Sequence, residues 1–119
     1  MPTKTAPICH VNIPAPDLAK AKAFYAKVFG WKCTPMRGMD WYSFWSVGEV
    51  SGGFDADAKP SRGGVTLYLA VADIPAAVRK VQRAGGKAVR PKTEIPGGMG
   101  FLATFDDPCG NRMGLWSKA

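Results

Sequence analysis

Hydrophobic and polar residues alternate, then recur at helical spacing, in the first third of the chain. The run "CHVNIP" (9–14) alternates as a strand does, and apolar side chains within 18–28 then follow a helical period. Asp17 stands where a helix N-cap is needed, because a short carboxylate can accept hydrogen bonds from first-turn amides. Gly30 is typical of a helix end. The pattern therefore predicts a strand followed by a helix.

The same pattern returns in the second half of the chain at a constant shift. A β-rich run at 65–71 precedes Asp73, which corresponds to Asp17, and Gly86 follows Asp73 at the same spacing as Gly30 follows Asp17. Further extended runs follow each helix: "WYSFWSV" and "VSGGF" in the first half, and "KAVR", "GFLATF" and "NRMGLW" in the second. Each half therefore predicts one strand, one helix and about three more strands.

This repeat predicts an α+β chain built from two tandem βαβββ modules. A single module leaves one apolar sheet face uncovered, so a tandem pair is the natural solution. We expect one domain over residues 1–119, with module 1 at about 7–55 and module 2 at about 64–118. The polar segment 56–63 contains proline and glycine and reads as the linker between them.

Composition narrows the setting of the protein. Hydrophobic content is 46% and charged content 21%, as in soluble globular proteins, and no apolar run is long enough to span a membrane. The N-terminus has no signal-peptide pattern. The three cysteines include no C-x-x-C pair, which favours a reducing environment. We therefore expect a cytoplasmic protein that does not associate with membranes.

The net charge of +7 favours neutral or anionic partners over cationic ones. The basic residues are scattered, and several fall on the predicted helices, where a solvated face explains them. No run of lysine and arginine and no nucleic-acid motif is present in the sequence. We therefore expect a small-molecule ligand and no nucleic acid.

Two motifs carry a resemblance to a known family. They are the D-P-x-G-N turn in "FDDPCGNRMGLW" (105–116) and the helix end "FYAKVFGW" (24–31). Together with the repeat, they make residues 8–117 resemble the vicinal oxygen chelate superfamily, which includes glyoxalase I, bleomycin and fosfomycin resistance proteins, and extradiol dioxygenases. The resemblance implies that eight strands curl into one mixed-sheet cup that holds the ligand, and that the protein is a homodimer.

The resemblance also implies four metal-ligand positions, usually filled by histidine and glutamate. His10 matches the first, whereas Thr66, Gly114 and, within a residue or two, Gly52 stand at the others. A stable site for a divalent transition metal requires at least three imidazole or carboxylate ligands. We therefore expect no cofactor, and the two glycines would instead leave room for a ligand. The alternative is a zinc, nickel, manganese or iron ion held by His10, Glu49 and an unrecognised ligand.

His10 is the only histidine and the one candidate catalytic residue, because its ordinary pKa lies near neutrality. It could equally contact a ligand or be a structural residue of the cup wall. Strand alternation places Asn12 on its face, and the repeat shift adds Thr66 and Tyr68 to a predicted polar cluster. No carboxylate close to His10 is evident from the sequence, so a catalytic dyad is not predicted.

The segment "MDWYSFWSV" (39–47) carries four aromatic residues. On a strand, Trp41 and Trp45 share one face, and Tyr42 and Phe44 share the other. One pair should pack under a helix and the other should line the cup. We predict that Trp41 and Trp45, together with Trp116, form the ligand-binding wall for a flat or apolar molecule.

These observations predict a glyoxalase- or bleomycin-resistance-like protein that binds a small neutral or anionic organic molecule, aromatic ones included, without the metal of the family. The mechanism would be sequestration or simple acid–base chemistry. Three alternatives stay open: a metal-dependent lyase or isomerase of the lactoylglutathione lyase type, an antibiotic-sequestering resistance protein, and a non-catalytic interaction module. Whether the chain is an enzyme is open on the sequence alone.

Overall fold

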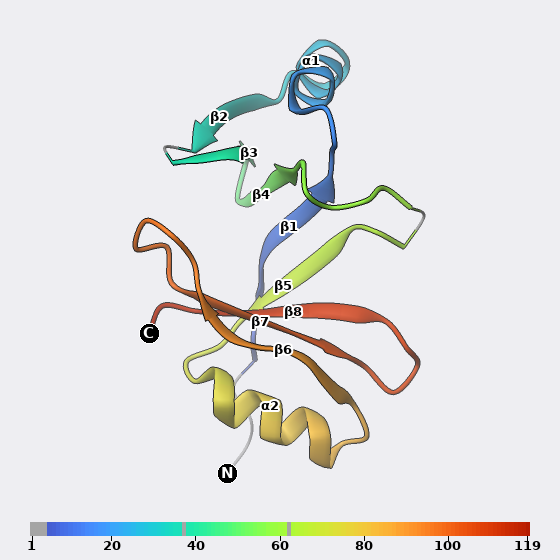
Figure 1. Cartoon of the computed structure of the whole chain (residues 1–119), viewed down its shortest axis with the longest axis vertical. Coiled ribbons are helices and arrows are strands. Elements are labelled where there is room, and N and C mark those ends of the chain that lie inside the picture. Colours follow the sequence, from blue (N-terminus) through green and yellow to red (C-terminus); the bar gives the residue numbers. More distant parts are fainter. Residues whose placement is uncertain (1–4, 37, 62) are drawn as a thin grey trace. The chain divides into compact units, whose positions relative to one another are not determined.

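The computed structural model describes residues 5–36, 38–61 and 63–119, which form two compact units. The N-terminal unit is His10–Thr66, and the C-terminal unit is Leu67–Ala119 together with the described residues up to Cys9. Figure 1 shows one helix and its own group of strands in each unit. No helix within the described ranges is long and apolar enough to cross a membrane.

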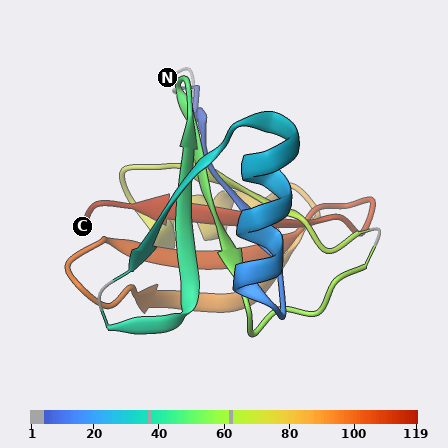
Figure 2. The same cartoon turned by 90° about the horizontal axis from the view of Figure 1, so that it is seen from above.

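The N-terminal unit follows the predicted strand–helix–three-strand order. Its elements are β1 (Ile8–Pro14), α1 (Leu18–Phe29), β2 (Lys32–Met36), β3 (Met39–Val47) and β4 (Val50–Asp55). The strands lie in the order β2-β3-β4-β1, with β1 parallel to β4 and the other neighbours antiparallel. Figure 2 shows α1 lying alongside these strands.

The C-terminal unit repeats this topology. Its elements are β5 (Thr66–Ala70), α2 (Ile74–Arg83), β6 (Lys87–Glu94), β7 (Phe101–Asp106) and β8 (Arg112–Ser117). The strand order is β5-β8-β7-β6, and β5 runs parallel to β8 as β1 does to β4. The α+β class and the two βαβββ modules predicted from the sequence are confirmed.

Both helices begin where the sequence predicts. Asp17 accepts a hydrogen bond from the backbone N–H of Lys20 at 3.0 Å, and Asp73 accepts one from Ala76 at 3.1 Å. Each carboxylate satisfies an amide that has no partner within its own helix. Gly30 ends α1 in the left-handed conformation, with φ of 71°, which glycine adopts without steric cost.

Each helix covers one face of the sheet in its own unit. In the N-terminal unit, Phe54 is fully buried, and Trp45 packs beside it in the cluster that α1 covers. In the C-terminal unit, Ile74 of α2 packs on Ala103 and Leu115. Among the described residues, the opposite face of each sheet carries no helix of its own unit, so ligand-contacting side chains can project from it.

The sequence predicted about three strands after the first helix but did not locate β2. Its segment, "KCTPM", contains Pro35, which has no N–H to donate to a neighbouring strand. β2 lies at the end of the strand order beside β3 alone, where a proline is tolerated. The register between β2 and β3 also shifts directly after Pro35. Proline at a sheet edge therefore hid a strand from the analysis of alternation.

Candidate ligand-binding faces

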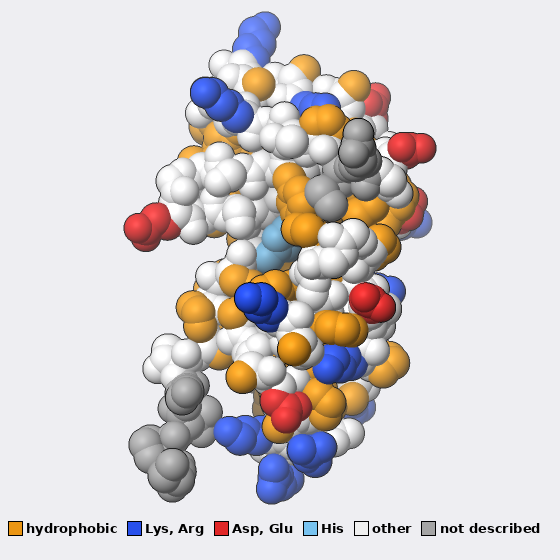
Figure 3. All heavy atoms as spheres, turned by 90° about the vertical axis from the view of Figure 1, so that its left-hand side faces the viewer, with side chains coloured by type: hydrophobic (Ala, Val, Ile, Leu, Met, Phe, Trp, Pro, Cys, Tyr) orange, Lys and Arg blue, Asp and Glu red, His pale blue; other side chains and the backbone are white. Residues whose placement is uncertain are grey.

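The helix-free face of the N-terminal unit carries the one histidine of the chain. Val11 and Ile13 of β1 pack against the core on the α1 side. Because side chains alternate along a strand, His10 and Asn12 lie on the opposite face. Figure 3 shows the histidine at the molecular surface. The two residues thus share a helix-free face as the sequence predicts, and their roles stay a prediction.

His10 forms a hydrogen bond with Tyr42 that passes over β4. Nε2 of His10 and the hydroxyl of Tyr42 lie 2.5 Å apart, and the two rings are inclined by only 17°. Tyr42 belongs to β3, and β4 lies between β3 and β1. A Cβ atom on Gly53 of β4 would overlap the ring and hydroxyl of Tyr42. Glycine at position 53 is therefore what allows the tyrosine to reach the histidine.

Burial lowers the pKa of His10 from its ordinary value of 6.5 to about 4. Desolvation penalises the charged imidazolium more than the neutral ring. At neutral pH the imidazole is therefore uncharged, with one nitrogen that donates and one that accepts, while the hydroxyl of Tyr42 can do either. The pair is an uncharged hydrogen-bonding group, and a base with so low a pKa is poorly suited to proton abstraction.

Acidification from pH 7 to pH 4 is expected to lower the free energy of unfolding through His10. The pKa is about 4 in the folded protein and 6.5 in the unfolded chain, so the unfolded state takes up the proton first as the pH falls. This contribution is complete above pH 6.5 and is lost towards pH 4, by about 3 kcal/mol at most. Urea unfolding at pH 7, 5.5 and 4 measures it, and His10→Gln should flatten the profile. Equal slopes in both proteins would contradict the expectation.

Asp55, at the end of β4, places a carboxylate on the same face. Its Oδ2 accepts a hydrogen bond from Nδ2 of Asn12 at 3.3 Å, and its Oδ1 accepts one from the backbone N–H of Asp57 at 2.9 Å. Asp55 is the ladder partner of Tyr42 between β3 and β4. Asp55 was not predicted from the sequence, where no carboxylate near His10 is evident. Alternation along β4 is the signal that could have found it.

The aromatic side chains of β3 divide between the faces in the opposite sense to the prediction. Trp45 is 4% exposed and belongs to the core cluster under α1, so its prediction as a ligand-binding residue is wrong. Tyr42 and Phe44 instead lie on the face of His10, and the rings of Phe44 and His10 meet edge-on with centroids 6.0 Å apart. Trp41 is 38% exposed and meets Tyr42 edge-on, and its contact with a ligand stays a prediction.

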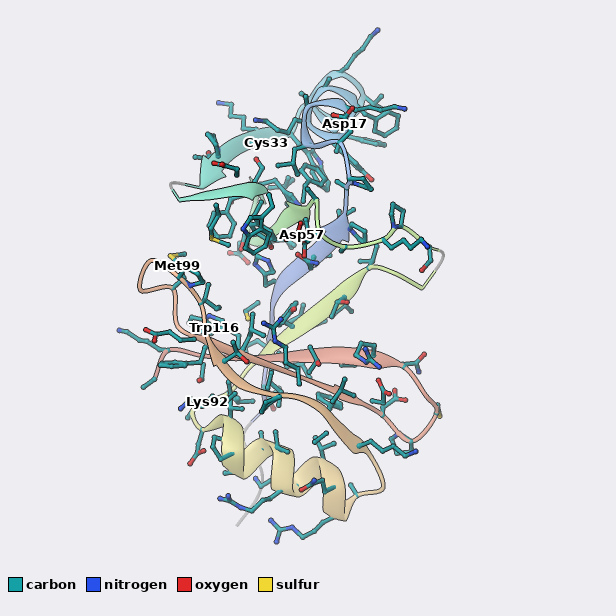
Figure 4. The ribbon with its side chains drawn as sticks, viewed as in Figure 1. Asp17, Cys33, Asp57, Lys92, Met99 and Trp116 are labelled. Atoms are coloured by element: carbon teal, nitrogen blue, oxygen red, sulfur yellow. The ribbon has the colours of Figure 1, made fainter. Side chains whose placement is uncertain are left out.

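The helix-free face of the C-terminal unit carries Tyr68 and Trp116. Leu69 and Leu115 pack in the core under α2, so their strand neighbours Tyr68 and Trp116 lie opposite. The indole Nε1 of Trp116 donates to the carbonyl of Met99 at 2.8 Å and ties the β6–β7 turn to β8 (Figure 4). The π face of Trp116, rather than its N–H, is therefore the part suited to a ligand.

Thr66 was predicted to join the polar cluster. It is the first residue of β5 and is half-buried. Its grouping with His10 stays a prediction, as does the role of Tyr68 as a ligand contact.

The strand register corrects one of the four implied metal positions. β1 pairs Asn12 with Gly53, and β5 pairs Tyr68 with Gly114. Asn12 and Tyr68 are equivalent in the repeat, so Gly53 rather than Gly52 corresponds to Gly114. Gly52 faces the helix-covered side of its sheet, where a Cβ atom would overlap a core tryptophan. The prediction was wrong by one residue, which on a strand changes the face.

The sequence suggested that glycines at two implied metal positions leave room for a ligand. Gly53 and Gly114, which stand at these positions, do not leave that room. A Cβ atom on Gly53 would overlap Tyr42, and one on Gly114 would overlap the ring of Tyr68. The absence of a side chain at each glycine makes room for a tyrosine ring of the same unit. The space that the missing side chains leave is therefore filled by aromatic carbon.

The residues at the four implied metal positions do not fit a divalent metal. His10 offers an imidazole and Thr66 a neutral hydroxyl, but Gly53 and Gly114 have no donor side chain. Glu49 lies exposed in the turn between β3 and β4, outside the paired strands. Over the described ranges, no group of three or more His, Cys, Asp or Glu side chains could hold a metal ion. At least three such ligands are needed.

The doubled βαβββ topology and the histidine on its helix-free face define the class of protein, and the sequence agrees. The chain belongs to the Glyoxalase/Bleomycin resistance protein/Dioxygenase superfamily, whose sequence profile it matches over residues 8–115. This is the family that the motifs of the sequence resemble.

Particular relatives match part of their own length only. The chain is 31% identical over 116 residues to "Putative glyoxylase CFP32" of Mycobacterium tuberculosis. This match covers 89% of this chain and 43% of that protein. It is 28% identical over 127 residues to the "Anthracycline biosynthesis protein DnrV" of Streptomyces peucetius, covering 90% of this chain and 45% of the relative. The chain thus spans less than half the length of these curated relatives.

A solved structure of a hypothetical protein from Bacillus halodurans is also similar. It superimposes with a TM-score of 0.74 at 15% identity, covering 98% of this chain and 96% of that one. A likeness at this identity shows the fold alone. A Glyoxalase/bleomycin resistance protein/dioxygenase superfamily member from Vibrio splendidus shares this fold, with a TM-score of 0.66 at 14% identity over 95% of this chain and 98% of that one.

Proposed function

We propose that this chain binds a small neutral or anionic organic molecule, aromatic in part, on the helix-free sheet faces, without a divalent metal. One observation carries the proposal. At the two places where the family would supply carboxylates, the chain has Gly53 and Gly114, and tyrosine rings cover both. Faces built in this way suit stacking and hydrogen bonding rather than metal chelation.

One relative supports an aromatic ligand: the name of DnrV, to which this chain is 28% identical, refers to anthracycline biosynthesis. The basic net charge of +7 favours a neutral or anionic ligand over a cationic one. A homodimer and a cytoplasmic location, both expected from the sequence, are part of the same proposal.

Binding is favoured over chemistry by the state of His10. Its imidazole is neutral at physiological pH, and its Nε2 shares a hydrogen bond with the phenol of Tyr42. A neutral phenol does not stabilise the imidazolium that forms when a histidine takes up a proton, as a carboxylate would. We therefore propose that the pair holds a ligand group, and that the chain sequesters or carries the molecule.

Metal content of the purified, untagged protein is the direct test. After incubation with zinc, nickel, manganese or iron(II) and removal of the excess, we expect far less than one ion per chain, because two of the four implied ligands are glycines. Retention near one ion per chain, lost in His10→Ala, would overturn the proposal and favour a metal-dependent lyase or isomerase.

A small-molecule screen by thermal shift and calorimetry then tests binding itself. Planar neutral and anionic compounds are expected to bind, and Trp116→Ala should weaken those that stack on the indole by about tenfold. Phe29→Ala is the control, because it removes an exposed aromatic ring from α1, on the helix-covered side of its sheet. A screen that returns no binder of any chemistry would refute the proposed function.

A further inference from the structure

Gly53 and Gly114 occupy the same place in the two repeats. Gly53 pairs with Asn12 across β4 and β1, and Gly114 pairs with Tyr68 across β8 and β5. Neither glycine has a positive φ, so the backbone alone does not require glycine at either position. What requires it is the ring above each one, which a Cβ atom would overlap.

The two rings arrive from different strands. Tyr68 comes from β5 and covers its own ladder partner, whereas Tyr42 comes from β3 and leans across β4. Tyr42 ends beside His10 of its own unit, with its hydroxyl 2.5 Å from Nε2. The N-terminal unit has a hydrogen-bonding pair where the family would have metal ligands, whereas the corresponding place in the C-terminal unit is covered by the ring carbons of Tyr68.

The surroundings of the pair select the kind of group that it accepts. The ring of Phe44 meets both His10 and Tyr42 edge-on, with centroids 6.0 and 5.5 Å apart. These rings give the site apolar walls. Asp55 lies on the same face, next to Tyr42 in the ladder, and its negative charge disfavours an anionic group placed close by. A neutral hydroxyl, which both donates and accepts, complements the neutral pair.

We infer that Tyr42 is a specificity-determining residue and that the ligand of the N-terminal face is a planar aromatic molecule with a neutral hydroxyl group, a phenol or naphthol in chemical class. The inference rests on the proposed function and narrows its ligand. The ring of the ligand contacts Phe44, which is half-buried, and its hydroxyl bonds to the His10–Tyr42 pair.

Binding of three probes to three proteins tests this. The probes are 2-naphthol, naphthalene and 2-naphthoate, which share a ring system and differ in the hydroxyl, its absence and a carboxylate. The proteins are the parent, Tyr42→Phe and Tyr25→Phe. The last is a matched control, because it removes a phenol oxygen from the helix-covered side of the same unit. Dissociation constants are measured by equilibrium dialysis at pH 7, and urea unfolding checks that each variant folds.

The parent is expected to bind 2-naphthol more tightly than naphthalene or 2-naphthoate. Tyr42→Phe should weaken 2-naphthol by about three- to tenfold, the effect of one hydrogen bond, and should leave naphthalene within about twofold. Tyr25→Phe should change neither. His10→Gln, a second variant that removes the imidazole, should also weaken 2-naphthol selectively.

Two results separate this inference from the proposed function. If 2-naphthol binds but Tyr42→Phe weakens both neutral probes equally or neither of them, the inference is overturned and the proposed function stands. If the parent binds only non-aromatic compounds of the screen, the inference is overturned together with the aromatic part of the proposed function, and only metal-free binding of a small molecule stands. If the parent binds no probe and no compound of the screen, both are overturned.

Discussion

Phe54→Ala is expected to lower the free energy of unfolding by about 3–5 kcal/mol. The side chain is fully buried, and its ring contacts those of Tyr25, Trp31 and Trp45 at centroid distances of 5.3, 6.4 and 6.5 Å. Truncation loses the free energy gained by burying the ring away from water. It also leaves a cavity, because the three rigid aromatic neighbours cannot move in to fill it. A loss of this size is a large part of the roughly 5–15 kcal/mol that is typical of a small protein.

Urea unfolding followed by circular dichroism measures this loss. Phe24→Ala is the matched control, because it removes the same ring from the same unit at a position that is 52% exposed. We expect it to cost less than about 1 kcal/mol. Equal losses in the two variants would show that Phe54 is not the centre of the core of the N-terminal unit.

The fold was predictable because the deciding signals are local and occur twice. Asp17 and Asp73 each cap a helix with their own carboxylate, an interaction with an amide in the first turn of the same helix. Because the two caps stand at equivalent places in the repeat, each prediction is a check on the other. The repeat predicted a further strand after the first helix, but β2 was not located because Pro35 interrupts its alternation.

The candidate site was less predictable, because alternation assigns residues to two faces without saying which face a helix covers. Trp45 was separated correctly from Tyr42 and Phe44, but which of the two faces packs under a helix depends on where α1 lies. In the structure, Trp45 belongs to the core cluster that α1 covers. That choice is made by tertiary packing, which the local pattern of β3 does not contain.

A one-residue uncertainty in register was enough to name Gly52 in place of Gly53 as the implied metal position on β4. Gly52 and Gly53 are adjacent, so either satisfied the spacing used on the sequence, but they lie on opposite faces of β4. Gly52 accommodates a core tryptophan and Gly53 accommodates Tyr42. Only the pairing of Asn12 with Gly53 distinguishes them. A pair of glycines that looked like an empty site is thus two separate packing requirements.

Gly114, which lies under a tyrosine ring in the C-terminal unit, is the position of the second large expected effect on stability. Gly114→Ala is expected to destabilise the protein by about 1–3 kcal/mol, because the new methyl group would overlap the ring of Tyr68 in a buried part of the strand. The φ of Gly114 is not positive, so the cost is one of space rather than backbone conformation. Gly63→Ala is the matched control, because a Cβ atom there would meet nothing within 4 Å.

A double-mutant cycle identifies the ring as the cause. Tyr68→Ala alone should destabilise the protein through lost packing, but in that background Gly114→Ala should cost little, because alanine then meets open space. We expect a coupling of about 1–2 kcal/mol between the two sites, measured by urea unfolding. Additive effects would mean that something other than Tyr68 excludes a side chain at position 114. Coupling of the expected sign would show that the ring of Tyr68 is what excludes a side chain at position 114, so that a carboxylate could stand there only if the tyrosine were replaced as well.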